Sequence, residues 1–327
     1  MTVVRAVVCA ELGPPSLLKV EELPDPVPGL TQVLVEVEAA GVNFVDGLFI
    51  AGQYQIKPPL PFTPGSEVAG RVAAVGEEVG TFSVGQRVMA STGLGGFASH
   101  ILVVEGSLSA IPDQLNAAQA ATFTQSFCTC LFALRDRAHL QPGETVLVLG
   151  AGGGIGLAAI AVARALGARV IGAASTADKR AAALEAGAEA VIDTTHASIK
   201  DEARSWAGGT GVDVVIDPIG GDAAEASLRA LGDGGRYLVI GFASGSIPRI
   251  PLNQVLLRNR SVLGIDWGIW AMQHFDLQQA LLDDLLHMAR DGRIIPVEPT
   301  TYALHDVARA LDDLLARRVV GKVALIP

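Results

Sequence analysis

The first third of the chain consists of short, mainly apolar segments of strand length that are separated by turn-forming residues. Residues 33–38, 67–75 and 98–104 follow this pattern and are rich in valine, which favours β-strands. Proline and glycine interrupt the segments, and nine of the 17 prolines lie before residue 65. Because these two residues favour turns, the pattern predicts a compact β-rich domain.

From about residue 116 to residue 260, strand-like and helix-like segments alternate. The apolar runs are short enough for buried strands, and the segments between them combine alanine and leucine with polar residues. This alternation predicts an α/β fold with a doubly wound parallel sheet. We expect strands at 146–149, 169–174, 190–192, 213–216 and 236–241, and helices at 157–166, 178–186 and 222–231.

The last part of the chain has apolar residues at helical spacing in two segments, 276–290 and 306–317. Their apolar sides contain Leu277, Leu281, Leu285 and Met288 in the first segment, and Val307, Leu311, Leu314 and Leu315 in the second. A strand-like segment follows at 321–326. Since these elements come after a complete parallel sheet, we expect the chain to return to its first domain.

Composition narrows the class of protein. With 327 residues, 50% of them hydrophobic, the chain is long enough for two globular domains with separate cores. The net charge of -10 opposes binding to nucleic acid or to an anionic membrane surface. Three cysteines, Cys9, Cys128 and Cys130, give no disulfide framework, so we expect a cytoplasmic protein.

No targeting or membrane segment is expected. The apolar run at the N-terminus ends at Glu11 and is too short for a signal peptide. Residues 145–163 are uncharged, but glycine and alanine form a turn within them, so we do not expect a membrane span.

Residues 144–156 combine a short apolar strand with a glycine-rich turn that leads into a helix-like segment. Ala151, Gly153 and Gly156 fit the pattern A-x-G-x-x-G, one substitution away from the dinucleotide-binding pattern G-x-G-x-x-G. Glycines let a pyrophosphate approach backbone N–H groups and the positive end of a helix. We therefore expect cofactor contacts at Ala151, Gly153, Gly154, Ile155 and Gly156, the alternative being a purely structural turn.

A second apolar strand, at 168–174, ends where an NAD-binding unit places Asp or Glu to bind the ribose 2′-hydroxyl. This chain has Ala174 there, followed by Ser175, Thr176, Lys179 and Arg180. Hydroxyl and cationic donors suit a 2′-phosphate, which a carboxylate would repel. The sequence thus favours NADPH, with contacts at Ser175 and Lys179. The alternative is that the two cations form only the solvated face of a helix.

Five stretches give a more specific signal: GVNFVD at 41–46, PGSEVAG at 64–70, LQPGETVLVLG at 140–150, VDVVIDPIGG at 212–221 and GRYLVIGFA at 235–243. Together they resemble the medium-chain dehydrogenase/reductase superfamily, and within it the zinc-free quinone oxidoreductases related to zeta-crystallin. The resemblance covers nearly the whole chain. It implies a GroES-like catalytic domain at 1–118 and 265–327 and a Rossmann NADPH-binding domain at 119–264.

Zinc-containing members of that superfamily hold a catalytic zinc with a cysteine in G-x-C-x-x-D and a histidine in G-H-E. This chain has Asn43 and Ser66 at those positions, and residues 86–110 lack the cysteines of a structural zinc site. The six histidines have no metal-ligand spacing. We therefore expect no metal site, and we expect Asp46 and Glu67 to be structural carboxylates.

Without zinc, hydrogen-bond donors must stabilise the oxyanion that forms on the acceptor. By resemblance, Asn43 lies beside the nicotinamide ribose and Tyr54 lines the substrate cleft, so both are catalytic candidates. The alternatives are an ordinary turn residue for Asn43 and a half-buried aromatic residue for Tyr54. The resemblance also implies cofactor contacts at Asn43, Thr129, Gly241, Phe242 and Ala243.

These observations favour an NADPH-dependent reductase of quinones or α,β-unsaturated carbonyls. An enoyl-thioester reductase and an NADPH-binding structural or RNA-binding protein are the alternatives, and the acidic charge counts against the RNA-binding role. Residues 260–265 resemble the strand through which relatives join two sheets, so we expect a homodimer.

Overall fold

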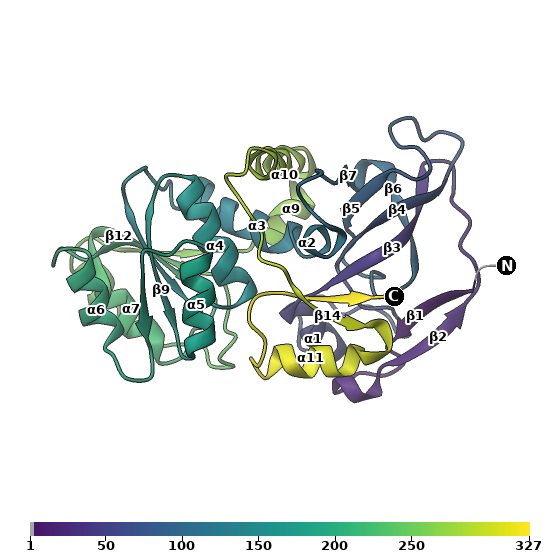
Figure 1. Ribbon diagram of the computed structural model, residues 1–327. Helices are drawn as coiled ribbons and strands as arrows, with labels where there is room; N and C mark the ends of the chain where they lie inside the picture. Colours follow the sequence, from purple (N-terminus) through teal and green to yellow (C-terminus); the bar gives the residue numbers. More distant parts are fainter. Residues whose placement is uncertain (1–2) are drawn as a thin grey trace. The chain divides into compact units, whose positions relative to one another are not determined.

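The computed structural model describes residues 3–327, which group into two compact units (Figure 1). The β-rich unit contains the chain up to Gln125 together with Glu298–Pro327, and the parallel-sheet unit contains Ser126–Val297.

The β-rich unit is built on a seven-stranded sheet of order β14-β15-β3-β4-β5-β7, with β6 pairing to β3. All its pairs are antiparallel except β14–β15. Its strands are β3 (Gln32–Val42), β4 (Glu67–Val75), β5 (Arg87–Ser91), β6 (His100–Val104), β7 (Leu108–Ala110), β14 (Thr300–Ala303) and β15 (Val323–Ile326). A separate antiparallel pair is formed by β1 (Val4–Val8) and β2 (Lys19–Leu23).

Short helices complete this unit: α1 (Phe44–Ile50), α2 (Ala117–Ala121), α11 (Val307–Leu315) and the 3-10 helices η1 (Pro15–Leu17), η2 (Glu105–Ser107) and η4 (Leu304–Asp306). The valines of β3 alternate into a core that also includes Leu311 of α11 and Leu325 of β15. The end of the chain thus returns to the first domain, as the sequence predicts, because β15 pairs with β3.

The parallel-sheet unit contains six parallel strands in the order β10-β9-β8-β11-β12-β13. They are β8 (Thr145–Leu149), β9 (Arg169–Ala174), β10 (Ala190–Asp193), β11 (Val212–Asp217), β12 (Leu231–Val239) and β13 (Ser261–Gly264). Numbered from β8, this is the strand order 3-2-1-4-5-6 of the Rossmann fold, whose ligands bind at the carboxyl ends of the strands. The predicted doubly wound sheet is confirmed.

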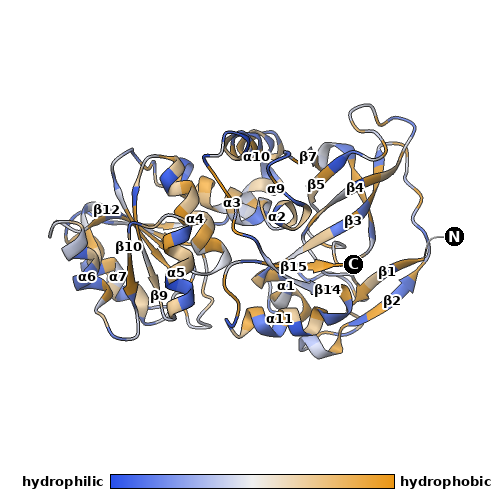
Figure 2. Cartoon of the chain, in the orientation of Figure 1, coloured by the Kyte–Doolittle hydropathy of each residue, from blue (hydrophilic) through white to orange (hydrophobic). Residues whose placement is uncertain are grey.

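The helices of this unit are α3 (Thr124–Leu131), the π-helix η3 (Phe132–Arg137), α4 (Gly154–Ala165), α5 (Ala177–Glu185), α6 (Ile199–Trp206), α7 (Ala223–Ala230), α8 (Leu252–Leu256), α9 (Trp267–Gln273) and α10 (Phe275–Arg290). Figure 2 shows hydrophilic residues on one side of α5 and α6, whereas β9 and β10 are mainly hydrophobic. This is the pattern of a sheet covered by amphipathic helices.

The two units differ from the predicted division in two places. Residues 119–125, predicted in the Rossmann domain, group with the β-rich unit, and residues 265–297, predicted in the first domain, group with the parallel-sheet unit. The ring of Trp270 stacks on Phe132 at 4.6 Å, and Arg135 forms an ion pair with Asp284 at 2.8 Å. The apolar stripe of α10 shows that the helix is buried on one side, but a stripe does not identify the surface that covers it.

Candidate active site

The glycine-rich turn connects the end of β8 to the first residue of α4. Gly150 has φ 59°, and the N–H of Gly153 donates to the oxygen of Gly150 at 2.9 Å, which closes the turn. A Cβ on Gly156 would lie 2.2 Å from that same oxygen, so only glycine fits there. The N–H groups of residues 154–156 begin a helix and have no partner within it, which makes them donors for an anion.

Ala151 takes the first position of the fingerprint, where glycine is usual. Its side chain is fully buried, and its N–H donates to the oxygen of Ala173 on β9 at 3.0 Å. A Cβ on Gly172 would lie 2.8 Å from the Cβ of Ala151. The methyl group at position 151 is therefore accommodated by the missing side chain at position 172 of the neighbouring strand.

The end of β9 supplies the residues predicted to bind the 2′-phosphate. Ala174 is buried, and Ser175 is exposed directly after it. Thr176 begins α5, its side chain accepting the N–H of Lys179 at 3.4 Å. A Cβ on Gly152 would lie 2.4 Å from the Cβ of Lys179, so the stem of this lysine lies against the glycine turn. The structure thus brings Lys179 to the predicted phosphate-binding turn.

Arg180 is occupied by contacts within the sheet. Its guanidinium forms an ion pair with Asp193 at 2.9 Å and donates to the oxygen of Ala174 at 3.3 Å. Asp193 lies opposite Ala174 in the β9–β10 register. Hydrogen bonds from Thr195, with a smaller contribution from Arg180, hold the pKa of Asp193 below its usual range. A carboxylate therefore lies near the end of β9, and a neighbouring cation compensates its charge.

Gly241, Phe242 and Ala243 lie just after β12, separated from it by Ile240. The N–H of Ala243 donates to the oxygen of Pro218 at 3.1 Å, and that of Gly241 to the oxygen of Asp217 at 3.4 Å. Phe242 is 37% exposed. These bonds fix the segment at the carboxyl end of β11, the edge of the sheet that contains the glycine turn.

Thr129 lies on α3 and is buried. The thiol of its neighbour Cys130 lies 3.5 Å from the oxygen of Ile155, in the first turn of α4. Cys128 accepts a hydrogen bond from Gln278 at 3.4 Å, and both cysteines are free thiols. The structure thus brings α3 to the start of α4.

Asn43 belongs to a buried polar cluster in the β-rich unit. Its amide nitrogen donates to Glu67 Oε1 at 2.8 Å and to Ser66 Oγ at 3.3 Å, and its oxygen accepts a hydrogen bond from Lys322. Lys322 also forms an ion pair with Glu67 at 3.4 Å. The Ser66 hydroxyl donates to Gln125 Oε1 at 3.0 Å. The Asn43 amide is therefore held rigidly by three side chains.

Asp46 lies beneath this cluster and has no exposed surface. Its Oδ2 accepts the N–H of Asn43 at 2.7 Å, which fixes the start of α1. Burial raises the pKa of Asp46 to about 7, and the nearby charge of Glu67 contributes to the same direction. The location supports the expected structural role of Asp46. Glu67 is also buried, but its bonds to Asn43 and Lys322 give it a larger part in the candidate site than the sequence indicated.

Tyr54 follows α1 and is half-buried. Its ring contacts Phe49, with centroids 4.7 Å apart and planes tilted by 59°. The ring is thus anchored by apolar packing. Asn43 and Tyr54 lie before and after the same seven-residue helix.

Two residues of the cluster, Gln125 and Lys322, were not singled out from the sequence. The β15–β3 register pairs Val323 with Val42, which brings the preceding Lys322 to the following Asn43. Gln125 reaches the cluster through its N–H, which donates to Glu67 Oε2 at 2.9 Å. For Lys322, the sequence shows only a lysine directly before a buried strand. This pattern does not identify the side chains that the lysine contacts.

Within residues 3–327, no group of three or more histidine, cysteine, aspartate or glutamate side chains is arranged to hold a metal ion. Asn43 and Ser66 occupy the positions at which zinc-containing members of the superfamily have their catalytic zinc ligands. These two side chains are hydrogen-bonded to each other. Over the same described range, no helix is both long and apolar enough to cross a membrane.

Comparison with known proteins gives the same assignment for both units. The family model for the alcohol dehydrogenase GroES-like domain matches residues 29–113, and that for zinc-binding dehydrogenase matches residues 154–283. A GroES-like unit combined with a six-stranded Rossmann sheet defines the class of medium-chain dehydrogenases and reductases.

Individual relatives match along almost the whole chain. Quinone oxidoreductase-like protein 2 of Bos taurus is 39% identical over 322 residues, which are 98% of this chain and 92% of the relative. The structure of Escherichia coli quinone oxidoreductase complexed with NADPH has a TM-score of 0.88 at 29% identity, covering 99% of this chain and 100% of that chain. A structure of an NAD-dependent alcohol dehydrogenase has a TM-score of 0.91 at 31% identity and covers 99% of both chains. The chain belongs to the quinone oxidoreductase family of medium-chain enzymes and is an oxidoreductase.

Proposed function

We propose that the protein is an NADPH-dependent reductase of quinones or α,β-unsaturated carbonyl compounds that works without zinc. The main support is the glycine turn, where a Cβ at position 156 would lie 2.2 Å from a backbone oxygen and where a helix begins. Such a turn admits a pyrophosphate to backbone N–H groups. When bound, NADPH supplies the hydride.

The preference for NADPH rests on the end of β9. Ala174 leaves the position of the NAD-type carboxylate empty, and Lys179 lies beside the glycine turn with Ser175 exposed nearby. Asp193 is the nearest acid on the adjacent strand, and Arg180 compensates its charge. We therefore assign the 2′-phosphate to Ser175 and Lys179. Ala151, Gly153, Gly154, Ile155 and Gly156 would hold the pyrophosphate, and Thr129, Gly241, Phe242 and Ala243 the nicotinamide end.

The residues at the zinc-ligand positions limit the class of acceptor that the protein can reduce. Asn43 and Ser66 are weak metal ligands compared with cysteine and histidine, and their side chains already hydrogen-bond within the cluster. A quinone or enone spreads the negative charge that hydride addition creates, so hydrogen bonds are sufficient to stabilise it. Simple ketones lack this delocalisation.

Two residues are assigned to the acceptor oxygen. Tyr54 would donate its hydroxyl hydrogen, since its ring is fixed against Phe49. Asn43 would donate the amide hydrogen that now makes the longer bond to Ser66, at 3.3 Å, while Lys322 and Glu67 keep the amide in place.

We also propose a cytoplasmic homodimer. Residues of β13 form the edge of the six-stranded sheet, and Val262 on this edge is 38% exposed. An apolar edge strand is protected from aggregation when it pairs with a second copy. The three free cysteines suit a reducing compartment. Light scattering at micromolar concentration tests the dimer, and a monomer would contradict it.

Initial rates test the reaction. They are measured with NADPH and with NADH against 1,4-benzoquinone, 9,10-phenanthrenequinone, 1-octen-3-one and crotonyl-CoA, with and without a chelator. We expect turnover of a quinone or an enone with NADPH that the chelator leaves unchanged. Loss of activity with chelator would refute the zinc-free mechanism, and preferred turnover of crotonyl-CoA would replace the acceptor class with enoyl thioesters.

A further inference from the structure

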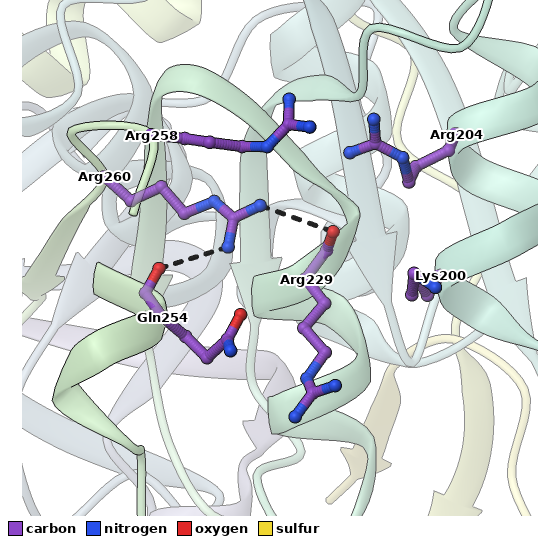
Figure 3. Close-up of a pocket in the computed structure, with 6 residues that line it drawn as sticks. All are labelled: Lys200, Arg204, Arg229, Gln254, Arg258 and Arg260. Atoms are coloured by element: carbon purple, nitrogen blue, oxygen red, sulfur yellow. Dashed lines mark hydrogen bonds between the residues drawn. The ribbon is translucent and has the colours of Figure 1, made fainter. Parts of the chain in front are cut away.

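A pocket of about 300 Å³ on the parallel-sheet unit is lined by five cationic side chains and one amide (Figure 3). The lining residues are Lys200, Arg204, Arg229, Gln254, Arg258 and Arg260. None of these described lining residues is acidic, although the whole chain has a net charge of -10. The pocket is therefore a local concentration of positive charge on an acidic protein.

The pocket lies at the amino ends of the parallel strands, whereas the glycine turn lies at their carboxyl ends. Arg260 directly precedes β13, and Arg229 lies two residues before β12, so both are at the amino ends of their strands. The glycine turn follows the carboxyl end of β8. In a parallel sheet these ends lie on opposite edges, and a five-residue strand spans about 16 Å. The pocket is consequently distinct from the proposed cofactor site.

Arg260 is buried in this pocket without a carboxylate partner. It is 7% exposed, and its guanidinium donates to the backbone oxygens of Gln254 at 3.1 Å and Leu231 at 2.7 Å. Its Nε is buried and has no hydrogen-bond partner. Burial lowers the pKa of Arg260, and the charges of Arg258, Arg204 and Arg229 lower it further. An unpartnered buried donor is unfavourable, and an anion in the pocket would relieve both the repulsion and the missing bond.

Two further guanidinium groups are directed into the same space. Figure 3 shows Arg204 and Arg258 extending toward each other from opposite sides of the pocket. Arg204 comes from α6 and donates to the oxygen of Gly209 at 2.8 Å. Arg258 lies in the loop before β13 with φ 70°. Planar guanidinium groups arranged in this way suit the bidentate binding of phosphate oxygens.

The remaining cations are partly neutralised. Lys200 pairs with Asp201 at 3.2 Å, and Arg229 pairs with Glu225 at 2.5 Å. Both carboxylates lie outside the lining of the pocket. The excess positive charge is therefore concentrated on Arg204, Arg258 and Arg260.

We propose that this pocket binds a small anion with two or more linked phosphate groups. Several cations around one space favour a multiply charged ligand over a single carboxylate. A volume of about 300 Å³ is at the small end of ligand sites, which suits a diphosphate group. Binding would connect α6, the end of α7 and the loop before β13.

Isothermal titration calorimetry with inorganic pyrophosphate tests the proposal. The full chain is titrated at physiological ionic strength, with and without NADPH, and is compared with the double variant R204Q/R258Q. A control for charge outside the pocket is Arg290→Gln, which removes one positive charge from an exposed position on α10. We expect pyrophosphate to bind the wild type and the control alike, and the double variant at least about tenfold more weakly.

Three results would overturn the proposal. They are no binding to the wild type, equal affinity in the double variant, and competition by NADPH, which would place the anion at the glycine turn instead. In the first of these cases, retention of single-stranded RNA would replace the small ligand with a nucleic-acid backbone. If the double variant does not fold, the single variant Arg258→Gln, at an exposed position, probes the same pocket and is expected to weaken pyrophosphate binding.

Discussion

The hydroxyl of Tyr237 donates to the buried carboxylate of Asp217, so that one side chain of β12 supports the turn after β11. The other carboxylate oxygen accepts the N–H groups of Ile219 at 2.7 Å and Gly220 at 2.8 Å. Gly220 has φ 65°, and a Cβ there would lie 2.8 Å from the ring of Phe242. The pair thus fixes the turn against which residue 242 lies.

Tyr237→Phe is expected to destabilise the fold by roughly 1–3 kcal/mol, because Asp217 Oδ2 would lose this hydroxyl donor. Asp217 is 2% exposed, so water does not readily replace the hydroxyl. Urea denaturation followed by circular dichroism measures the change. The control is Tyr302→Phe, which removes a hydrogen bond to Asp313 near the surface and should have a smaller effect. Equal losses in the two variants would contradict a special role for the buried pair.

Two glycines of the turn are expected to respond differently to alanine. A Cβ at Gly153 would meet only the oxygen of Gly150, at 3.4 Å, whereas one at Gly156 would lie 2.2 Å from it. Gly156→Ala should therefore destabilise the fold by about 1–3 kcal/mol through overpacking. Gly153→Ala should change stability by less but weaken NADPH binding at least about tenfold, because its methyl group would occupy the approach of the pyrophosphate. Denaturation and fluorescence titration separate the two effects, and tight NADPH binding by Gly153→Ala would place the pyrophosphate elsewhere.

Cofactor preference is expected to change with Ala174→Asp. The new carboxylate would repel a 2′-phosphate and accept a hydrogen bond from a ribose hydroxyl. We predict that the KM for NADPH rises at least about tenfold and that the KM for NADH falls. The matched control is Ala174→Asn, because asparagine has the shape of aspartate without its charge. This variant should leave the KM for NADPH largely unchanged. Similar KM changes in both variants would indicate a steric cause.

Asp46 is expected to make stability depend on pH. Its pKa is about 7 in the fold and about 3.9 in an unfolded chain. Below pH 4 the carboxyl is protonated in both states, and between pH 4 and 7 only the unfolded chain releases the proton. The wild type should therefore lose stability relative to Asp46→Asn as pH rises, by roughly 4 kcal/mol in total, with no further loss above pH 7. A difference between the two proteins that does not change with pH would contradict this prediction.

Tyr54→Phe is expected to reduce kcat about a hundredfold, because it removes one donor to the acceptor oxygen. Ring packing against Phe49 should remain, so stability and the KM for NADPH should be unchanged. Steady-state kinetics with the best quinone or enone measure the effect, and Tyr302→Phe is again the control. An unchanged kcat would limit Tyr54 to packing.

The sequence predicted those elements whose signals are local. The strands at 67–75 and 169–174 have the predicted bounds, and the parallel sheet that strand and helix alternation predicts is present. The strand predicted at 33–38 was too short, since β3 continues to Val42. Its added residues include Ala39, Ala40 and Gly41, which are small and buried and so do not alternate with polar residues.

The glycine turn was predictable for the same reason, because all its parts lie within seven residues. The cluster around Asn43 was not, since Lys322 reaches it only through pairing between strands at opposite ends of the chain. Local patterns also gave no sign that Arg180 would pair with Asp193, which depends on the β9–β10 register. The cationic pocket likewise draws its residues from separate elements, α6, α7, α8 and the loop before β13.

The short distance between positions 151 and 172 restricts the order in which substitutions at these two positions can accumulate. A Cβ at position 172 would lie 2.8 Å from that of Ala151 and 3.3 Å from that of Ala183, so a side chain at position 172 needs glycine at position 151 and a small shift of Ala183. Glycine at 151 removes the closer of these two contacts, whereas the reverse order passes through a more strongly overpacked intermediate. The two positions should therefore be epistatic, and an alanine in the first fingerprint position should be found together with a glycine on the neighbouring strand.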